Sequence, residues 1–237
     1  MTIKTQSGVA LILVLLVTSF VSAVGLGLAL VVFMDQLAGG NHRGYAAMVY
    51  AADAGIELAV RDLALLDDWN AALAGTTRGR FTDGAPTGVR AIPGGGAVNL
   101  TAETNLLNCG RRSACTSGQM DANSRERPWG ANNPRWRLYA YGPFQDLLHV
   151  ARPAPCYLAV WVADDSREED DDPSADAEVE EPGHGVMRVH AQTFGPMGGR
   201  RAIEAELARV CRFEDGEEDC RPGIRVQSWQ ELRQLLP

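Results

Sequence analysis

The sequence predicts an α+β protein in which one long N-terminal helix packs on an antiparallel sheet of three to four strands with long loops. Three observations lead to this prediction. An uncharged apolar run extends from Val9 to Met34. An apolar stripe with helical spacing follows it. The second half of the chain carries short runs typical of strands, which turn-forming and acidic stretches separate.

The uncharged run is long enough to cross a membrane, since 26 residues exceed the roughly 20 that a bilayer core needs. A secretory signal peptide is one interpretation, with Val21-Ser22-Ala23 as its cleavage site. Cleavage there would leave an apolar new N-terminus, Val24 to Met34. A plain membrane anchor is the second interpretation. In that case Lys4 favours a cytoplasmic N-terminus.

A third interpretation uses the residues that follow the run. No proline occurs before Pro86, and apolar residues recur every three or four positions from 45 to 66. One helix over 9–66 would be roughly 87 Å long at about 1.5 Å per residue, far more than an anchor needs. We therefore predict a membrane or filament-core part, 9–34, and an amphipathic continuation, 35–66. The predicted stripe comprises Tyr45, Val49, Ala52, Ile56, Ala59, Leu63 and Leu66.

The N-terminal residues resemble a known family. Gly8 separates a basic leader from the apolar run, and "AADAGIELA" occupies 51–59. This combination resembles type IV prepilins, most closely the PilX-type minor pilins. The resemblance implies that residues 1–8 are a leader, which a prepilin peptidase removes by cutting between Gly8 and Val9. The apolar helix then stays on the mature protein.

The fifth mature residue would be Leu13, where most major pilins carry a glutamate. PilX-type minor pilins and the tip pseudopilin K of type II secretion often lack that acid. The resemblance therefore implies a structural minor pilin of a type IV pilus, assembled into the filament or at its tip. A type II secretion minor pseudopilin and a membrane-anchored periplasmic binding protein are the alternatives. The tip pseudopilin carries a large helical insertion, which a chain of 237 residues is not expected to hold.

The same resemblance implies partners and a location. Expected partners are other pilins and minor pilins, the prepilin peptidase, the inner-membrane pilus assembly platform and a tip adhesin. The chain is expected to cross the bacterial inner membrane once, with its C-terminal domain in the periplasm, and then to enter a pilus at the cell surface. Nucleic acid is not an expected partner, because the net charge is −8 and no basic cluster is present.

The globular part, 67–237, divides by composition. The stretch 67–134 is rich in glycine, asparagine, threonine and proline and predicts a loop region that Trp69, Trp129 and Trp136 pin to the sheet. A carbohydrate platform is the alternative role for these tryptophans. Strand-like runs follow within 135–210, at 135–142, 156–163, 186–194 and 200–210. The tail, 211–237, is compatible with a short docked helix carrying Trp229, Leu232, Leu235 and Leu236.

Five cysteines suit an oxidising compartment such as the periplasm. Two pairs are close enough in sequence to close short disulfide loops, Cys109 with Cys115 and Cys211 with Cys220. Cys156 is then the unpaired thiol, and its place at the start of an apolar run predicts burial.

The motifs of common enzymes are absent from the sequence: its four histidines have no metal-site spacing, and no phosphate loop or nucleophile motif occurs. We therefore expect no catalysis and no organic cofactor. The acidic stretch 164–181 carries a charge of −10 and is most simply a solvated loop. Calcium binding and a partner-binding surface are the alternatives. The candidate calcium ligands are Asp164, Asp165, Asp170, Asp172 and Asp176.

Overall fold

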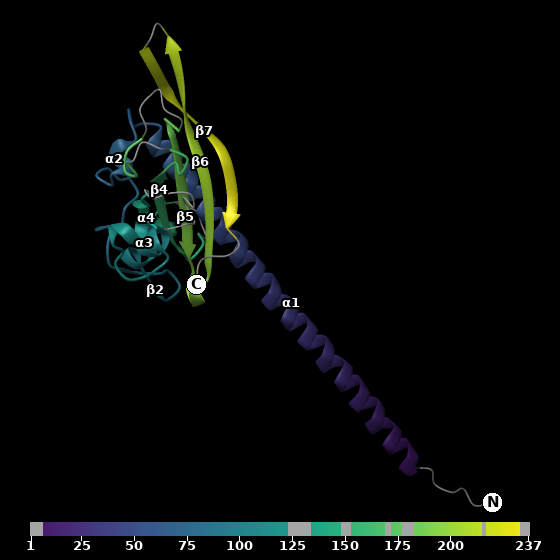
Figure 1. Ribbon diagram of the computed structural model, residues 1–237. Helices are drawn as coiled ribbons and strands as arrows, with labels where there is room; N and C mark the ends of the chain where they lie inside the picture. Colours follow the sequence, from purple (N-terminus) through teal and green to yellow (C-terminus); the bar gives the residue numbers. More distant parts are fainter. Residues whose placement is uncertain are drawn as a thin grey trace, which may run out of the picture. The chain divides into compact units, whose positions relative to one another are not determined.

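The computed structural model describes residues 7–122, 134–147, 153–168, 172–176, 183–214 and 217–232, and the side chains among these except at 7–8, 211–214 and 217–222. The chain forms two compact units that divide after Tyr45. The first unit consists of the N-terminal part of helix α1 (Ser7–Leu63), and the second contains the end of α1 and the sheet (Figure 1).

Five strands form one antiparallel sheet in sequence order. The α+β class is thus confirmed, with one strand more than the sequence predicts. Four of the strands coincide with the predicted runs, and the Gly-Pro turn between the third and fourth holds a short 3₁₀ helix, Pro196–Gly198. The strands are β3 (Arg137–Pro143), β4 (Tyr157–Asp164), β5 (Val186–Phe194), β6 (Arg200–Glu214) and β7 (Glu217–Leu232).

The end of α1 covers one face of this sheet. The predicted stripe supplies the contact: Ala52, Ile56, Ala59 and Leu63 are each at most 2% exposed. Gly55 allows the helix to approach closely, because a Cβ at this position would lie 2.9 Å from Leu158 Cδ1 and 3.1 Å from Val160 Cγ2. The helix ends at Leu63 rather than at Leu66.

The stretch 67–134 is not the loop region that its composition predicts. It forms α2 (Asn70–Leu73), β1 (Val89–Ala91), β2 (Ala97–Asn99), α3 (Leu100–Cys109) and α4 (Ser117–Asp121). The Asn99 side chain caps α3 by accepting a hydrogen bond from the Ala102 N–H, and Gly110 ends the helix with a φ of 70°. Capping residues therefore allow a helix to form in a stretch whose composition is typical of loops.

Strand β2 and helix α3 give the sheet a second core, whereas α2 packs into the core beneath α1. Val98 and Leu100 pack with Trp136, Tyr157 and Trp161 on the face opposite α1. Every residue of β4 is buried, which explains its continuous apolar sequence. Trp69 and Trp136 are core residues, as the packing interpretation predicts rather than the carbohydrate platform. Trp129 lies outside the described residues.

Extra residues in two strands change which side chains share a face. In β3, Leu138 pairs with Trp161 and Ala140 with Val160, so that Tyr139 is an inserted residue. Alternation places Trp136, Leu138 and Ala140 on one face. This prediction is wrong for Ala140, which joins the core beneath α1.

The tail forms strand β7 rather than the short helix suggested by its sequence. Leu207 pairs with Val226 and Glu206 with Ser228, so Gln227 is the inserted residue. The insertion places Val226 and Trp229, three positions apart, opposite Leu207 and Ala205 on the same face. The helix prediction rested on Trp229 and Leu232, which are three positions apart, but these residues pair with Ala205 and Ala202 and therefore lie on opposite faces of the sheet. Leu235 and Leu236 lie outside the described residues.

We expect Gly55→Val to lower the free energy of unfolding by about 1–3 kcal/mol relative to Gly44→Val, because the new side chain overpacks the interface between α1 and the sheet. Both variants change helix propensity equally, and a Cβ at Gly44 meets nothing within 4 Å. Denaturant unfolding of the detergent-solubilised chain, followed by tryptophan fluorescence, measures the difference. Equal stability of the two variants would contradict the close approach.

Candidate functional site

The apolar segment of α1, Val9–Leu37, is the most unusual surface of the chain. Its large apolar side chains are roughly half exposed or more; Val9 is 65% exposed and Phe20 69%. Burying one such side chain yields about 1.5–3 kcal/mol, so covering the whole segment is worth tens of kcal/mol. Monomeric soluble proteins rarely expose more than a few hundred Å² of contiguous apolar surface. The segment therefore requires lipid or protein around it.

This helix is long and apolar enough to cross a membrane. Its polar groups suit such a medium where the structure describes them. The Thr18 hydroxyl lies 2.9 Å from the Val14 carbonyl oxygen and 3.1 Å from that of Leu15, so it donates within the helix. The predicted cleavage bond between Gly8 and Val9 lies within the described part of α1.

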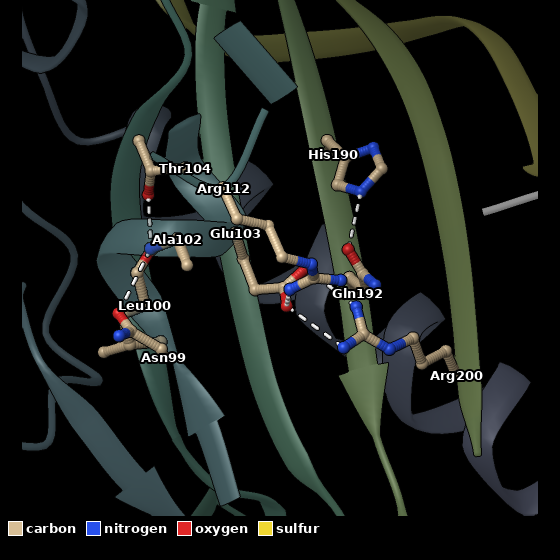
Figure 2. Close-up of polar contacts among 9 residues, drawn as sticks. All are labelled: Asn99, Leu100, Ala102, Glu103, Thr104, Arg112, His190, Gln192 and Arg200. Carbon is tan, nitrogen blue, oxygen red and sulfur yellow. Dashed lines mark hydrogen bonds and ion pairs between the residues drawn. The ribbon is translucent and has the colours of Figure 1, made fainter. Parts of the chain in front are cut away.

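The second core contains a buried carboxylate that fastens α3 to the sheet (Figure 2). Glu103 is 2% exposed. Its Oε1 accepts a hydrogen bond from Arg112, and Arg200 at the start of β6 donates to both oxygens at 2.7 and 3.0 Å. Sequence reasoning missed this residue, because Arg200 is 97 positions away and no local pattern marks the pair.

His190 on β5 occupies a polar site within the same face (Figure 2). Its Nδ1 lies 3.0 Å from Glu204 Oε1, and its Nε2 lies 3.4 Å from Gln192 Oε1. Burial alone would raise the pKa of Glu204, but hydrogen bonds and charges from His190 and Arg188 outweigh it and lower that pKa. The sheet thus holds an ionised glutamate through two neighbours.

Cys156 is buried and unpaired, as predicted. Burial raises the pKa of its thiol to about 12, which keeps it protonated and unreactive at neutral pH. It belongs to the core beneath α1, whereas His190 contacts Trp136 and Trp161 on the other face. The two residues therefore do not form a nucleophile and base.

The predicted disulfide between Cys109 and Cys115 is present, with an S–S distance of 2.07 Å. It joins the end of α3 to the chain that leads into α4. Cys211 and Cys220 are direct neighbours across the β6–β7 ladder, which brings their backbones together. Their side chains lie outside the described set, so this second disulfide stays a prediction.

The acidic stretch brings three carboxylates together. Asp164, Glu168 and Asp176 each place one oxygen within 4.8 Å of the others. Asp164 and Asp176 are predicted ligands, while Glu168 is a residue that sequence reasoning missed. Asp165 and Asp172 stand outside this group, and Asp170 lies outside the described residues.

One part of this stretch is packed, which corrects the interpretation as a solvated loop for Asp164, Asp165 and Glu168, whereas Asp172 is exposed. Asp164, Asp165 and Glu168 are each at most 5% exposed. Asp176 accepts a hydrogen bond from the Gly185 N–H at 2.8 Å, and its own N–H donates to Asn70. Burial raises the pKa of Asp165, against an opposing interaction with Arg167. Asp164, Asp165, Glu168 and Asp176 are therefore part of the folded domain.

The three clustered oxygens are the described groups that would hold a hard cation. Calcium takes six to eight oxygens, of which these would supply about half, and acidic clusters also occur without an ion. Calcium binding accordingly stays a prediction. A rise in melting temperature at millimolar calcium would support it, and the absence of any shift would end it.

We expect Glu103→Gln to lower the free energy of unfolding by about 2 kcal/mol, because charge-assisted hydrogen bonds to two arginines are lost. The loss is less than for a fully buried ion pair, since the Arg112 and Arg200 side chains are 47% and 29% exposed and regain water. Glu57→Gln on the exposed face of α1 is the control. Equal unfolding free energies for the two variants would refute the role of Glu103.

The lowered pKa of Glu204 predicts a pH dependence of stability. Its stabilising contribution is fully present above the ordinary glutamate pKa of 4.5 and is lost as the pH falls through the lower pKa of the folded state. We expect Glu204→Gln to make the loss of stability on acidification shallower, whereas Glu57→Gln leaves it unchanged. Unfolding curves recorded from neutral to acidic pH measure this, and parallel curves for all three proteins would contradict it.

No family model matches the chain, and no curated protein or solved structure matches it. The apolar segment of α1 is the feature of this chain that most clearly requires another molecule, because lipid or protein has to cover it.

Proposed function

We propose that this chain is a minor subunit of a type IV pilus, of the PilX type, that joins the filament or its tip through the apolar segment. One observation carries the proposal. A single helix, α1, supplies both the exposed apolar segment and the core stripe that packs beneath the sheet. This is the arrangement expected when one helix serves assembly at one end and folding at the other.

A role as a membrane anchor alone does not explain the length of this helix. A bilayer crossing needs about 20 residues, whereas α1 has 57. A signal peptide accounts less well still, because cleavage after Ala23 would cut within α1. It would also leave Val24 to Leu37, most of whose large side chains are about half exposed or more, at a new N-terminus in water.

In the proposed mechanism the apolar segment waits in the inner membrane and then enters a filament core built of similar helices. Val9 to Met34 carry no charge that has to be desolvated in this transfer, and Asp35, near the end of the segment, is the one charged residue within it. Helix packing and close approach at small residues then supply the association energy, since lipid and apolar protein are similar solvents. Gly25 and Gly27 have open space around their Cα atoms for such an approach.

Leu13 supports a minor or tip position. A carboxylate at the fifth mature position would be costly in hydrocarbon unless a neighbouring subunit paired with it. A subunit at the tip has no subunit ahead of it, so an apolar residue avoids that cost. Leu13 is 58% exposed, so it is available to lipid or to another helix.

A type II secretion pseudopilus is the second candidate, favoured by the helices between α1 and β3. Among the described residues these helices are short, and the longest, α3, has 10 residues. They do not amount to the large helical insertion of a tip pseudopilin. The pilus therefore remains the first proposal.

We expect the protein isolated from its own cells to begin at Val9, as intact-mass spectrometry would show. Gly8→Val should retain residues 1–8, because the proposed peptidase cuts after glycine. Gly25→Val, a change of the same kind within the helix, should leave processing intact. An N-terminus at Val24 would support a signal peptide, and one at Met1 would leave only an anchor.

Surface filaments sheared from intact cells should contain the processed chain. Its absence from them, together with impaired protein secretion on deletion of its gene, would assign it to the type II system.

A further inference from the structure

A cavity of about 340 Å³ opens in the folded domain beside α3, α4 and β3. Its volume falls at the lower end of the range of small-molecule sites, about 300–1,000 Å³. We call it the arginine pocket, and its polar wall comprises Arg78, Thr87, Thr101, Asn105 and Arg137, with Trp136 among the apolar lining.

The arginine pocket is positively charged, whereas the chain as a whole is negatively charged. The sequence has 30 acidic and 22 basic residues. Two arginines but no aspartate or glutamate stand among the described residues that line the cavity. A concave surface with this charge attracts anions rather than cations.

Arg137 is the inner arginine and is half-buried. Its Nε lies 3.3 Å from the Leu73 carbonyl oxygen, and its Nη2 lies 3.4 Å from Ser174 Oγ, so the described acceptors are neutral. Burial and the nearby charge of Arg135 lower the pKa of Arg137. A half-buried guanidinium group loses part of its hydration, and a bound anion would provide the opposite charge that offsets this loss.

The remaining polar wall supplies neutral hydrogen-bonding groups. Thr87 and Thr101 are exposed and Asn105 is half-buried. Thr101 Oγ1 accepts a hydrogen bond from the Gly88 N–H, which leaves its own hydrogen available for donation. Hydroxyl and amide groups beside a cationic group match a ligand that carries both hydroxyls and a carboxylate.

The pocket is held on a rigid frame. Helix α3 is capped at both ends, and the disulfide between Cys109 and Cys115 fixes the chain that follows it. Asn108 holds Trp136 by two hydrogen bonds, one to its N–H at 2.8 Å and one from its own amide to the Trp136 carbonyl at 3.1 Å. Sites on such supports lose little entropy on binding.

We propose that the arginine pocket binds a sugar acid, with its carboxylate on Arg78 and Arg137 and its hydroxyl groups on the threonine and asparagine wall. The exposed Arg78 would supply a planar fork for the carboxylate, whereas Arg137, whose Nε and Nη2 already donate to Leu73 and Ser174, would contribute its Nη1. The site lies wholly within the sheet domain and does not depend on filament assembly.

Calorimetric titration of the full chain in detergent micelles tests the proposal with glucuronate, glucose and inorganic phosphate as probes. We expect glucuronate to saturate one site at millimolar concentration, and glucose and phosphate to bind at least roughly tenfold more weakly. Arg137→Gln and Arg78→Gln should each weaken glucuronate binding roughly tenfold, the loss expected from one charged hydrogen bond. Arg225→Gln, on an exposed part of β7, is the matched control and should bind as the unchanged chain does.

The proposal is overturned if glucuronate fails to saturate, if phosphate binds as tightly as glucuronate, or if Arg225→Gln weakens binding as much as the pocket variants. Arg78 is exposed, so its variant tests the site even if Arg137→Gln unfolds. A negative result would leave the filament proposal intact, since N-terminal processing is measured independently.

Discussion

The packing of α1 against the sheet is the interaction on which the rest of the domain depends. Gly55 brings the helix backbone close to Leu158 and Val160, so the stripe from Ala52 to Leu63 closes one face of the sheet. The contact also assigns roles along the helix. Its final turns belong to the folded domain, whereas Val9–Leu37 is exposed and needs another apolar environment.

The second face is closed by elements that come between α1 and β3, and here electrostatics supplements apolar packing. Glu103 holds α3 to β6 through Arg200, and Glu204 is kept ionised between His190 and Arg188. The arginine pocket lies where these added elements meet β3. A filament subunit of this kind would therefore carry its assembly surface on α1 and a separate binding surface on its added elements.

Much of this architecture follows from periodicity. The stripe on α1 and the four strand-like runs that form β3 to β6 are predicted from the sequence and present in the structure. Strand β7 escaped prediction because the spacing of three between Trp229 and Leu232 suggests a helix, whereas pairing with Ala205 and Ala202 places the two side chains on opposite faces of the sheet. The ion pair between Glu103 and Arg200 escaped it because folding, rather than local sequence, brings the two residues together.

In the proposed function, other subunits cover the apolar segment once the chain has entered the filament. A photo-crosslinking amino acid in place of Leu16, which is 65% exposed, tests it most directly in intact cells. The account predicts that sheared surface filaments contain the processed chain joined to a second filament subunit through this position. Crosslinks to lipid alone, with the chain confined to the inner membrane, would contradict it.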